Sequence, residues 1–252
     1  MILYCNGDSY SMLSTTKNRY SEYLGNLLDA DTVINNGLPG SCNARIIRTI
    51  VRDILDIRKN INDTVLAVIC LGSMIRNEWW NIDKVLPNGF NDGHFESFQI
   101  HGVKGNQQLP YYQYAHEWYR HYNDEAEQTN FFKELVMLTS FLKQQHVEYI
   151  IFAGNNLTYK AINYQDIFIK SFADYIHNDP NILDLNNFSF TGYCLEQQHI
   201  PFDKDQWGIN GHHADPAHQD FAKFLFNHYN IHCRNKLNFK TTQQIKNTPK
   251  KY

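Results

Sequence analysis

The chain has 252 residues, 42% of them hydrophobic and 14% aromatic, which is enough to bury a substantial core. The formal net charge of −3 argues against a protein that neutralises nucleic-acid phosphates over a long surface. No apolar run reaches the length of a membrane span, and no signal peptide is visible before Asn6. We therefore expect no nucleic-acid or membrane partner and a cytoplasmic location, in the virion or the host cytoplasm if the source is viral.

In chain order, short apolar runs alternate with stretches whose apolar residues repeat at helical spacing. The run TVLAVICL is typical of a strand that is buried on both faces. Such alternation predicts an α/β fold, a three-layer α/β/α sandwich around a parallel sheet of about five strands. We expect strands at 2–5, 32–35, 64–71, 147–153 and 181–185. We expect helices at 18–28, from 41 or 43 to 55, 131–142, 164–176 and 217–229.

One stretch, from 78 to about 125, lacks this rhythm and is dense in aromatic residues. So long an irregular segment in a compact domain is usually functional or disordered, and its aromatic content argues against disorder. We interpret it as an insertion over the active-site end of a single domain at 1–230, with plain packing as the alternative. Residues 231–252 are predicted to be a polar, basic tail.

The tripeptide Gly7-Asp8-Ser9 follows directly after the first predicted strand. A nucleophilic serine needs an exposed hydroxyl on a tight backbone turn, which a neighbouring glycine permits. Ligands of parallel sheets bind beyond the carboxyl ends of the strands, where this turn lies. The alternative is a helix cap formed by Asp8 and Ser9.

Asp215-Pro216-Ala217-His218 precedes the last predicted helix. A base for serine needs an imidazole whose second nitrogen is fixed by a carboxylate. The spacing of three residues brings Asp215 and His218 to the same side. A helix-capping aspartate and a surface histidine are the alternative for this pattern taken alone.

The two motifs together resemble the SGNH (GDSL-like) hydrolase family, which has GDS after strand one and DxxH before the terminal helix. The segment INNGLPG is similar to the family's second block, and the match assigns its oxyanion-hole glycine to Gly40. The motifs extend over nearly the whole chain in the family's order. The resemblance implies a flavodoxin-like SGNH fold and a catalytic triad of Ser9, His218 and Asp215, with no cofactor.

The third block differs from the family pattern. The third strand ends in LGSMIRN, which places Met74 where the family has an oxyanion-donating asparagine. A thioether cannot donate a hydrogen bond, and loss of one oxyanion donor costs roughly 100- to 1000-fold in turnover. Three outcomes stay open: a replacement donor from a shifted loop, a site that uses only two backbone amides, or an inactive site. The candidate donors are the amides of Ser9 and Gly40 and the side chains of Ser73 and Arg76, ahead of Asn77. A structural ion pair with a carboxylate, for example that of Glu78, is the alternative role of Arg76.

Other polar clusters have weaker interpretations. The segment His212 to His218 offers three imidazoles, but no second ligand cluster completes a metal site, and we expect no metal. The five cysteines lack CxxC spacing, which suits a reducing compartment. Asn155 follows the fourth strand and either lines the pocket or forms a turn. Trp79 and Trp80 are candidates for stacking on a sugar, or simply fill a core.

These features predict a serine esterase that acts on a small acyl ester, with an acetyl group on a carbohydrate as the substrate that the resemblance implies. The alternative is a catalytically inactive protein on the same fold, such as a viral structural or glycan-binding protein, and Met74 is its main support. A nucleotide-binding protein of flavodoxin-like fold is a third reading, but the sequence lacks a glycine-rich phosphate loop. The oligomeric state is left open.

Overall fold

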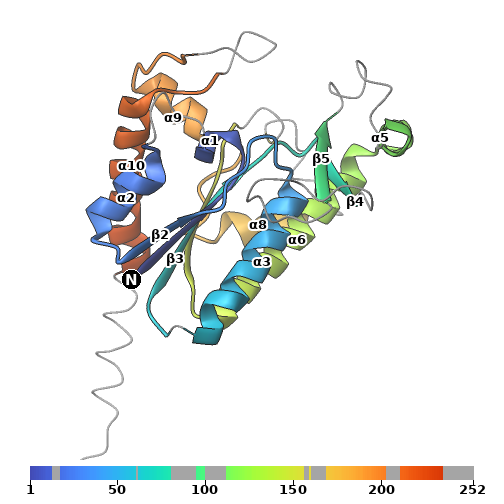
Figure 1. Cartoon of the computed structure of the whole chain (residues 1–252). Coiled ribbons are helices and arrows are strands. Elements are labelled where there is room, and N and C mark those ends of the chain that lie inside the picture. The colour runs from blue at the N-terminus through green and yellow to red at the C-terminus, as the bar shows by residue number, and fades with distance from the viewer. Residues whose placement is uncertain are drawn as a thin grey trace, which may run out of the picture.

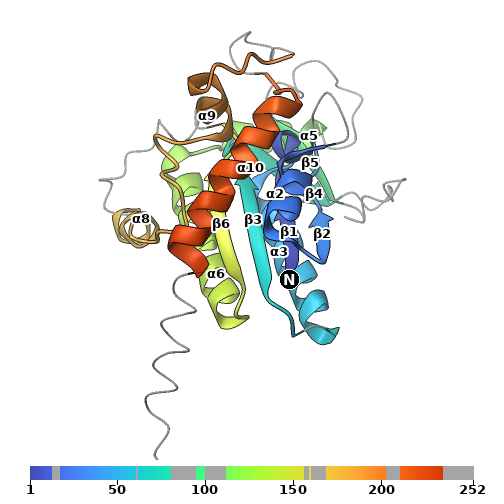
Figure 2. The ribbon, with the colours of Figure 1, turned by 90° about the vertical axis from the view of Figure 1, so that its left-hand side faces the viewer.

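The computed structural model describes residues 1–12, 18–60, 62–80, 95–99, 112–155, 159, 169–202 and 211–234. Its central sheet has four parallel strands in the order β2-β1-β3-β6 (Figure 2). These strands are β1 (Ile2–Asn6), β2 (Thr32–Asn35), β3 (Val65–Leu71) and β6 (Glu148–Ala153). Where a fifth strand was expected, Ile182 forms a single parallel bridge to Ile151.

Helices cover both faces of this sheet, and each face has its own buried apolar cluster (Figure 1). The first face packs against α3 (Asn43–Asn60), α6 (Asp124–Gln144) and α8 (Lys170–His177). The second packs against α2 (Tyr20–Leu28), α9 (Phe190–Glu196) and α10 (Asp215–Tyr229). All seven residues of β3 are buried, as its continuous apolar run predicts. The predicted α/β fold with a parallel sheet between two helical layers is confirmed.

Several element boundaries differ from the sequence prediction. The helix expected at 131–142 begins earlier, because the side chain of Asn123 accepts a hydrogen bond from the Ala126 amide and caps α6. A four-residue helix, α1 (Ser9–Met12), follows the first strand and was not expected. Of the helix expected at 164–176, the described part begins at Lys170.

The aromatic segment is more regular than the sequence suggested. Strand β4 (Arg76–Trp80) pairs antiparallel with β5 (Phe95–Gln99), and helix α5 (Tyr112–Arg120) follows. The prediction of a segment without strands or helices was therefore wrong for its described part. The hydroxyl of Tyr119 donates to the carbonyl of Ile75 at 2.9 Å and ties α5 to the start of the hairpin.

At the other end of the chain, α10 continues into a π-helical turn, η1 (Asn230–Arg234), whose Cys233 is buried. The first residues of the predicted tail thus pack on the domain, and 235–252 lie outside the described residues. All five cysteines are buried and none is in a disulfide. Among the described helices, none combines the length and apolarity that a bilayer crossing requires.

Candidate active site at the carboxyl end of the sheet

The carboxylate of Asp8 lies at the point where three central strands end. Its neighbours are two glycines, Gly72 after β3 and Gly154 after β6. A Cβ atom on Gly72 would lie 2.7 Å from the Ser41 carbonyl oxygen, and one on Gly154 would lie 2.6 Å from the Tyr10 ring. Because both residues lack side chains, the Ser41 carbonyl and the Tyr10 ring can pack against the strand ends beside Asp8.

Asp8 also shapes the turn that presents Ser9. Its side-chain Oδ1 accepts the Tyr10 amide at 3.1 Å, and its carbonyl accepts the Ser11 amide at 3.1 Å. These bonds cap the N-terminus of α1, which begins at Ser9. The helix cap given above as an alternative is therefore present, and Asp8 forms it. Ser9 is 8% exposed, and its hydroxyl has no hydrogen-bond partner among the described residues.

The loop after β2, which contains Gly40, is held against this turn. The Leu38 amide donates to the Gly7 carbonyl at 2.9 Å, and the Ser41 hydroxyl donates to the Leu38 carbonyl at 2.7 Å. Gly40 has a φ of 81°, a left-handed conformation that favours glycine. The second block of the SGNH resemblance therefore lies beside the first.

Arg76, the first residue of β4, connects these two segments to the chain that follows β3. Its Nη1 atom lies 3.2 Å from Oδ2 of Asp8 and donates to the Ser41 carbonyl at 3.4 Å. Burial raises the pKa of Asp8, and the positive charge of Arg76 opposes that rise. Arg76 thus forms the ion pair with a carboxylate that was its alternative role, but its partner is Asp8. Glu78, the partner suggested, forms a two-pronged salt bridge with Arg48 at 3.1 and 2.8 Å.

The other third-block residues face different surroundings. Met74 packs against the core cluster on the first face of the sheet. Ser73 is half-buried, and its hydroxyl accepts the Ile75 amide at 3.4 Å. The donor roles suggested for Ser73 and Arg76 stay predictions.

His218 and Asp215 both form hydrogen bonds with residues of α2. His218 is completely buried, and its Nδ1 atom accepts the Tyr20 amide at 3.3 Å. Asp215 accepts a hydrogen bond from the Tyr23 hydroxyl at 3.0 Å. Within the described part of the chain, no hydrogen bond joins either residue to Ser9, so the predicted triad stays a prediction that these contacts do not support.

A different histidine of the same segment lies next to the serine turn. The half-buried His212 ring packs on the Tyr10 ring with a centroid distance of 5.5 Å. The adjacent His213 is buried edge-on against Phe190 at 5.7 Å. The DxxH spacing gave no weight to His212. His212 directly precedes His213, which forms a β-bridge with Pro201, and this placement is visible only in three dimensions.

Asn155 lies where the sequence placed it, directly after β6 and half-buried. Burial raises the pKa of the Tyr10 hydroxyl, and hydrogen bonding with the side chains of Asn155 and Thr191 opposes that rise. Asn155 is therefore a neighbour of the serine turn. Its role in substrate binding stays a prediction.

The backbones of Trp79 and Trp80 lie in β4, while their side chains are outside the described residues.

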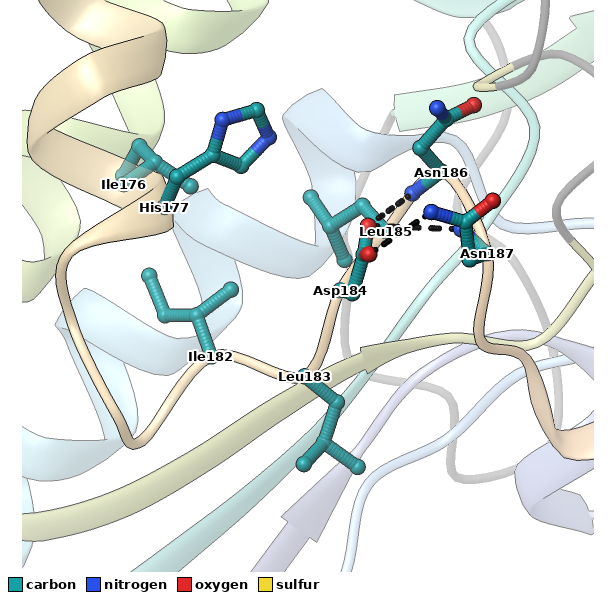
Figure 3. Close-up of a pocket in the computed structure, with 8 residues that line it drawn as sticks. All are labelled: Ile176, His177, Ile182, Leu183, Asp184, Leu185, Asn186 and Asn187. Atoms are coloured by element: carbon teal, nitrogen blue, oxygen red, sulfur yellow. Dashed lines mark hydrogen bonds between the residues drawn. The ribbon is translucent and has the colours of Figure 1, made fainter.

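A separate pocket of about 260 Å³ lies between α8 and the segment after it (Figure 3). Its lining includes His177 and Asp184. The Asp184 carboxylate accepts the amides of Asn186 and Asn187 and the side chain of Asn187. The carboxylate is thus used in a turn, and we assign no chemistry to this pocket.

Solved structures similar to this fold include a protein of the G-D-S-L lipolytic family from Desulfitobacterium hafniense, with a TM-score of 0.47, 10% identity, and coverage of 90% of this chain and 98% of that one. The acetyl xylan esterase AlAXEase has a TM-score of 0.43 and 14% identity, with coverage of 90% and 98%. The esterase EstA from Pseudoalteromonas has a TM-score of 0.43 and 14% identity, with coverage of 94% and 98%. At these scores the likeness says nothing about activity. No curated protein matches the sequence.

One family model matches residues 14–176, which is well over half of the chain. The matched range includes α2 and extends into α8, and it leaves both the Ser9 turn and the histidine-rich segment outside. On this match, the chain belongs to the family of unknown function DUF6071.

Proposed function

We propose that this protein is a serine hydrolase that cleaves a small acyl ester, with Ser9 as its nucleophile. The observation that supports this most is the joining of three segments around one turn. The Leu38 amide binds the Gly7 carbonyl, and Arg76 binds both Asp8 and the Ser41 carbonyl. These segments are the ones that resemble the first three blocks of the SGNH hydrolases, and ligands of parallel sheets bind at this end of the strands.

The chemistry proposed is acyl transfer. The Ser9 oxygen attacks the ester carbonyl while a histidine of the C-terminal segment takes its proton, and water later releases the acyl group. The amides of Ser9 and Gly40 are the proposed oxyanion donors, with Ser73 and Arg76 as further candidates. Arg76 already donates to Asp8 and Ser41, which makes it first of all a support of the turn.

The substrate class proposed is an acetyl or similarly small ester, with a carbohydrate as the alcohol part. This choice comes from the SGNH resemblance. No cofactor is needed for this chemistry, because serine and histidine supply the nucleophile and the proton transfer.

A catalytically inactive binding protein is the second candidate, and Met74 favours it. The side chain at the expected donor position packs into the apolar core and has no hydrogen to donate. A site built this way has at most the backbone amides and a repositioned side chain for the oxyanion.

Turnover of p-nitrophenyl acetate separates the two candidates. We expect the wild type to hydrolyse the ester and Ser9→Ala to lose at least about 100-fold in kcat. Ser140→Ala is the matched control, because Ser140 is exposed on α6 and its hydroxyl donates to the carbonyl of Val136 within its own helix. Equal rates for wild type and Ser9→Ala would favour the binding protein.

A further inference from the structure

We propose that His212, and not His218, is the base that activates Ser9. This inference rests on the proposed function and names the histidine of that same site. It follows from the way in which the two imidazoles are held, one inside the core and the other against the serine turn.

The hydrogen bond of His218 fixes the wrong tautomer for a base. Its Nδ1 atom accepts the Tyr20 amide at 3.3 Å, so Nδ1 carries no proton. The proton of the neutral ring is then on Nε2, which can only donate. A base for Ser9 needs the reverse arrangement, with a proton on Nδ1 held by a carboxylate and a free lone pair on Nε2.

The surroundings of His218 keep it in that state. The ring is fully buried, stacks on Tyr20 at 6.2 Å and lies 5.0 Å from the Phe190 ring. The carboxylate meant to orient it, Asp215, accepts a hydrogen bond from the Tyr23 hydroxyl of α2 at 3.0 Å. His218 thus acts as an acceptor for the first turn of α2 inside an aromatic cluster, which is a structural role.

His212 is placed differently, at the carboxyl end of the sheet. Its ring lies between the rings of Tyr10, at 5.5 Å, and Phe202, at 6.2 Å. Its carbonyl accepts the Phe202 amide at 2.9 Å, and the next residue, His213, bridges to Pro201. The backbone at His212 and at the residue after it is therefore held in place, and the His212 side chain is half-buried.

The same ring is close to both sequence neighbours of Ser9. It contacts Tyr10 directly, and its positive charge when protonated acts against the rise that burial causes in the pKa of Asp8. A group that interacts with the residues before and after a serine is well placed to reach its hydroxyl. An imidazolium formed during the reaction would also be stabilised by the carboxylate of Asp8.

In the proposed step, a ring nitrogen of His212 takes the proton from Ser9 Oγ as Oγ bonds to the carbonyl carbon. The imidazolium then returns that proton to the leaving alcohol as the ester bond breaks and the acyl-enzyme forms. A water molecule attacks the acyl carbon, gives its proton to His212, and the carboxylic acid leaves as Ser9 regains the proton.

The test makes the same substitution at both histidines. An asparagine at 218 can present its side-chain oxygen to the Tyr20 amide, so His218→Asn preserves the structural bond. We expect His218→Asn to keep p-nitrophenyl acetate turnover close to wild type, and His212→Asn to lose at least about 100-fold in kcat with little change in KM. Added imidazole should restore part of the turnover of His212→Gly and none of any loss in His218→Gly. That is a response which a purely structural role would not give.

The outcomes distinguish this inference from the function on which it rests. Thermal unfolding profiles of both variants first establish that each is folded. Full turnover by folded His212→Asn, with turnover lost in folded His218→Asn and in Ser9→Ala, would overturn the assignment to His212 while leaving the hydrolase intact. Absence of turnover in the wild type would overturn the proposed function and the base assignment together.

Discussion

Removal of the Arg76 guanidinium should destabilise the fold, because it leaves the carboxylate of Asp8 buried without its cation. The two groups are 3.2 Å apart, Asp8 is 2% exposed and the Arg76 side chain is 19% exposed. At an effective dielectric constant of about 20, unit charges at that distance attract by roughly 5 kcal/mol. Breaking one side of such a pair typically costs about 3–5 kcal/mol, and we expect Arg76→Met to lose an amount in that range near neutral pH.

The pH dependence of this loss has a definite sign. Burial already raises the pKa of Asp8, and Arg76 opposes the rise, so the variant should have a still higher Asp8 pKa in the folded state. A carboxyl group whose pKa is raised on folding stabilises the protein when it is protonated. That stabilisation is lost as pH rises through the folded-state pKa. The destabilisation of Arg76→Met should therefore shrink as the pH is lowered.

Urea unfolding of four proteins measures this effect: wild type, Arg76→Met, Asp8→Asn and the double variant. The double variant should be more stable than the sum of the single losses predicts, because no uncompensated charge is left. Lys170→Met is the control, since its ion pair with Asp174 is exposed on α8 and should matter little. The reasoning would be refuted if Arg76→Met were as stable as wild type, if its loss grew toward acid pH, or if the single losses were additive.

Two further predictions concern close contacts. Gly154→Ala should destabilise the protein by about 1–3 kcal/mol and slow ester turnover, because its new methyl group would lie 2.6 Å from the Tyr10 ring beside Ser9. An unchanged melting temperature and an unchanged rate would contradict this prediction. Asp179→Asn should flatten the acid side of the stability–pH curve. Burial alone would raise the pKa of Asp179, but hydrogen bonds from Lys143 and Tyr149 lower it overall, so its stabilising effect is present at neutral pH and is lost as pH falls through that lowered value. Urea midpoints that fall equally with acid in both proteins would show that this carboxylate is not responsible.

The sheet could be predicted from the sequence because three of its strands, β1, β3 and β6, are short and mostly apolar runs. β2 has the bounds expected for it, and β3 and β6 begin one residue later than expected. The hairpin of β4 and β5 was missed for the opposite reason. Its strands are rich in charged and aromatic residues and lack a continuous apolar run, so the Asn88-Gly89 and Asp92-Gly93 turn signals between them were not read as parts of a hairpin.

The candidate site was predicted in part. Local spacing correctly placed the turn at Ser9 and the loop at Gly40 at the same end of the sheet, since both follow parallel strands. The prediction of His218 relied on DxxH spacing, and the same sequence also shows a helical stripe that His218 shares with Phe221, Ala222 and Leu225. Residues at i, i+3, i+4 and i+7 face the same side, so that stripe directs His218 into the core.

The position of His212 could not be read from local sequence. It depends on the bridge between Pro201 and His213 and on the packing of Tyr10 against His212, a contact between segments about two hundred residues apart. No periodicity or spacing rule reports such a contact. Only the fold brings the imidazole to the turn.

The central claim is that Ser9 is a nucleophile, and covalent labelling tests it most directly. The native protein is treated with a fluorophosphonate probe and the modified peptide is identified by mass spectrometry, with heat-unfolded protein and Ser9→Ala as controls. The account predicts a single label on Ser9 of the native protein and none in either control. A native protein that stays unlabelled, or a label that persists in Ser9→Ala, would contradict it.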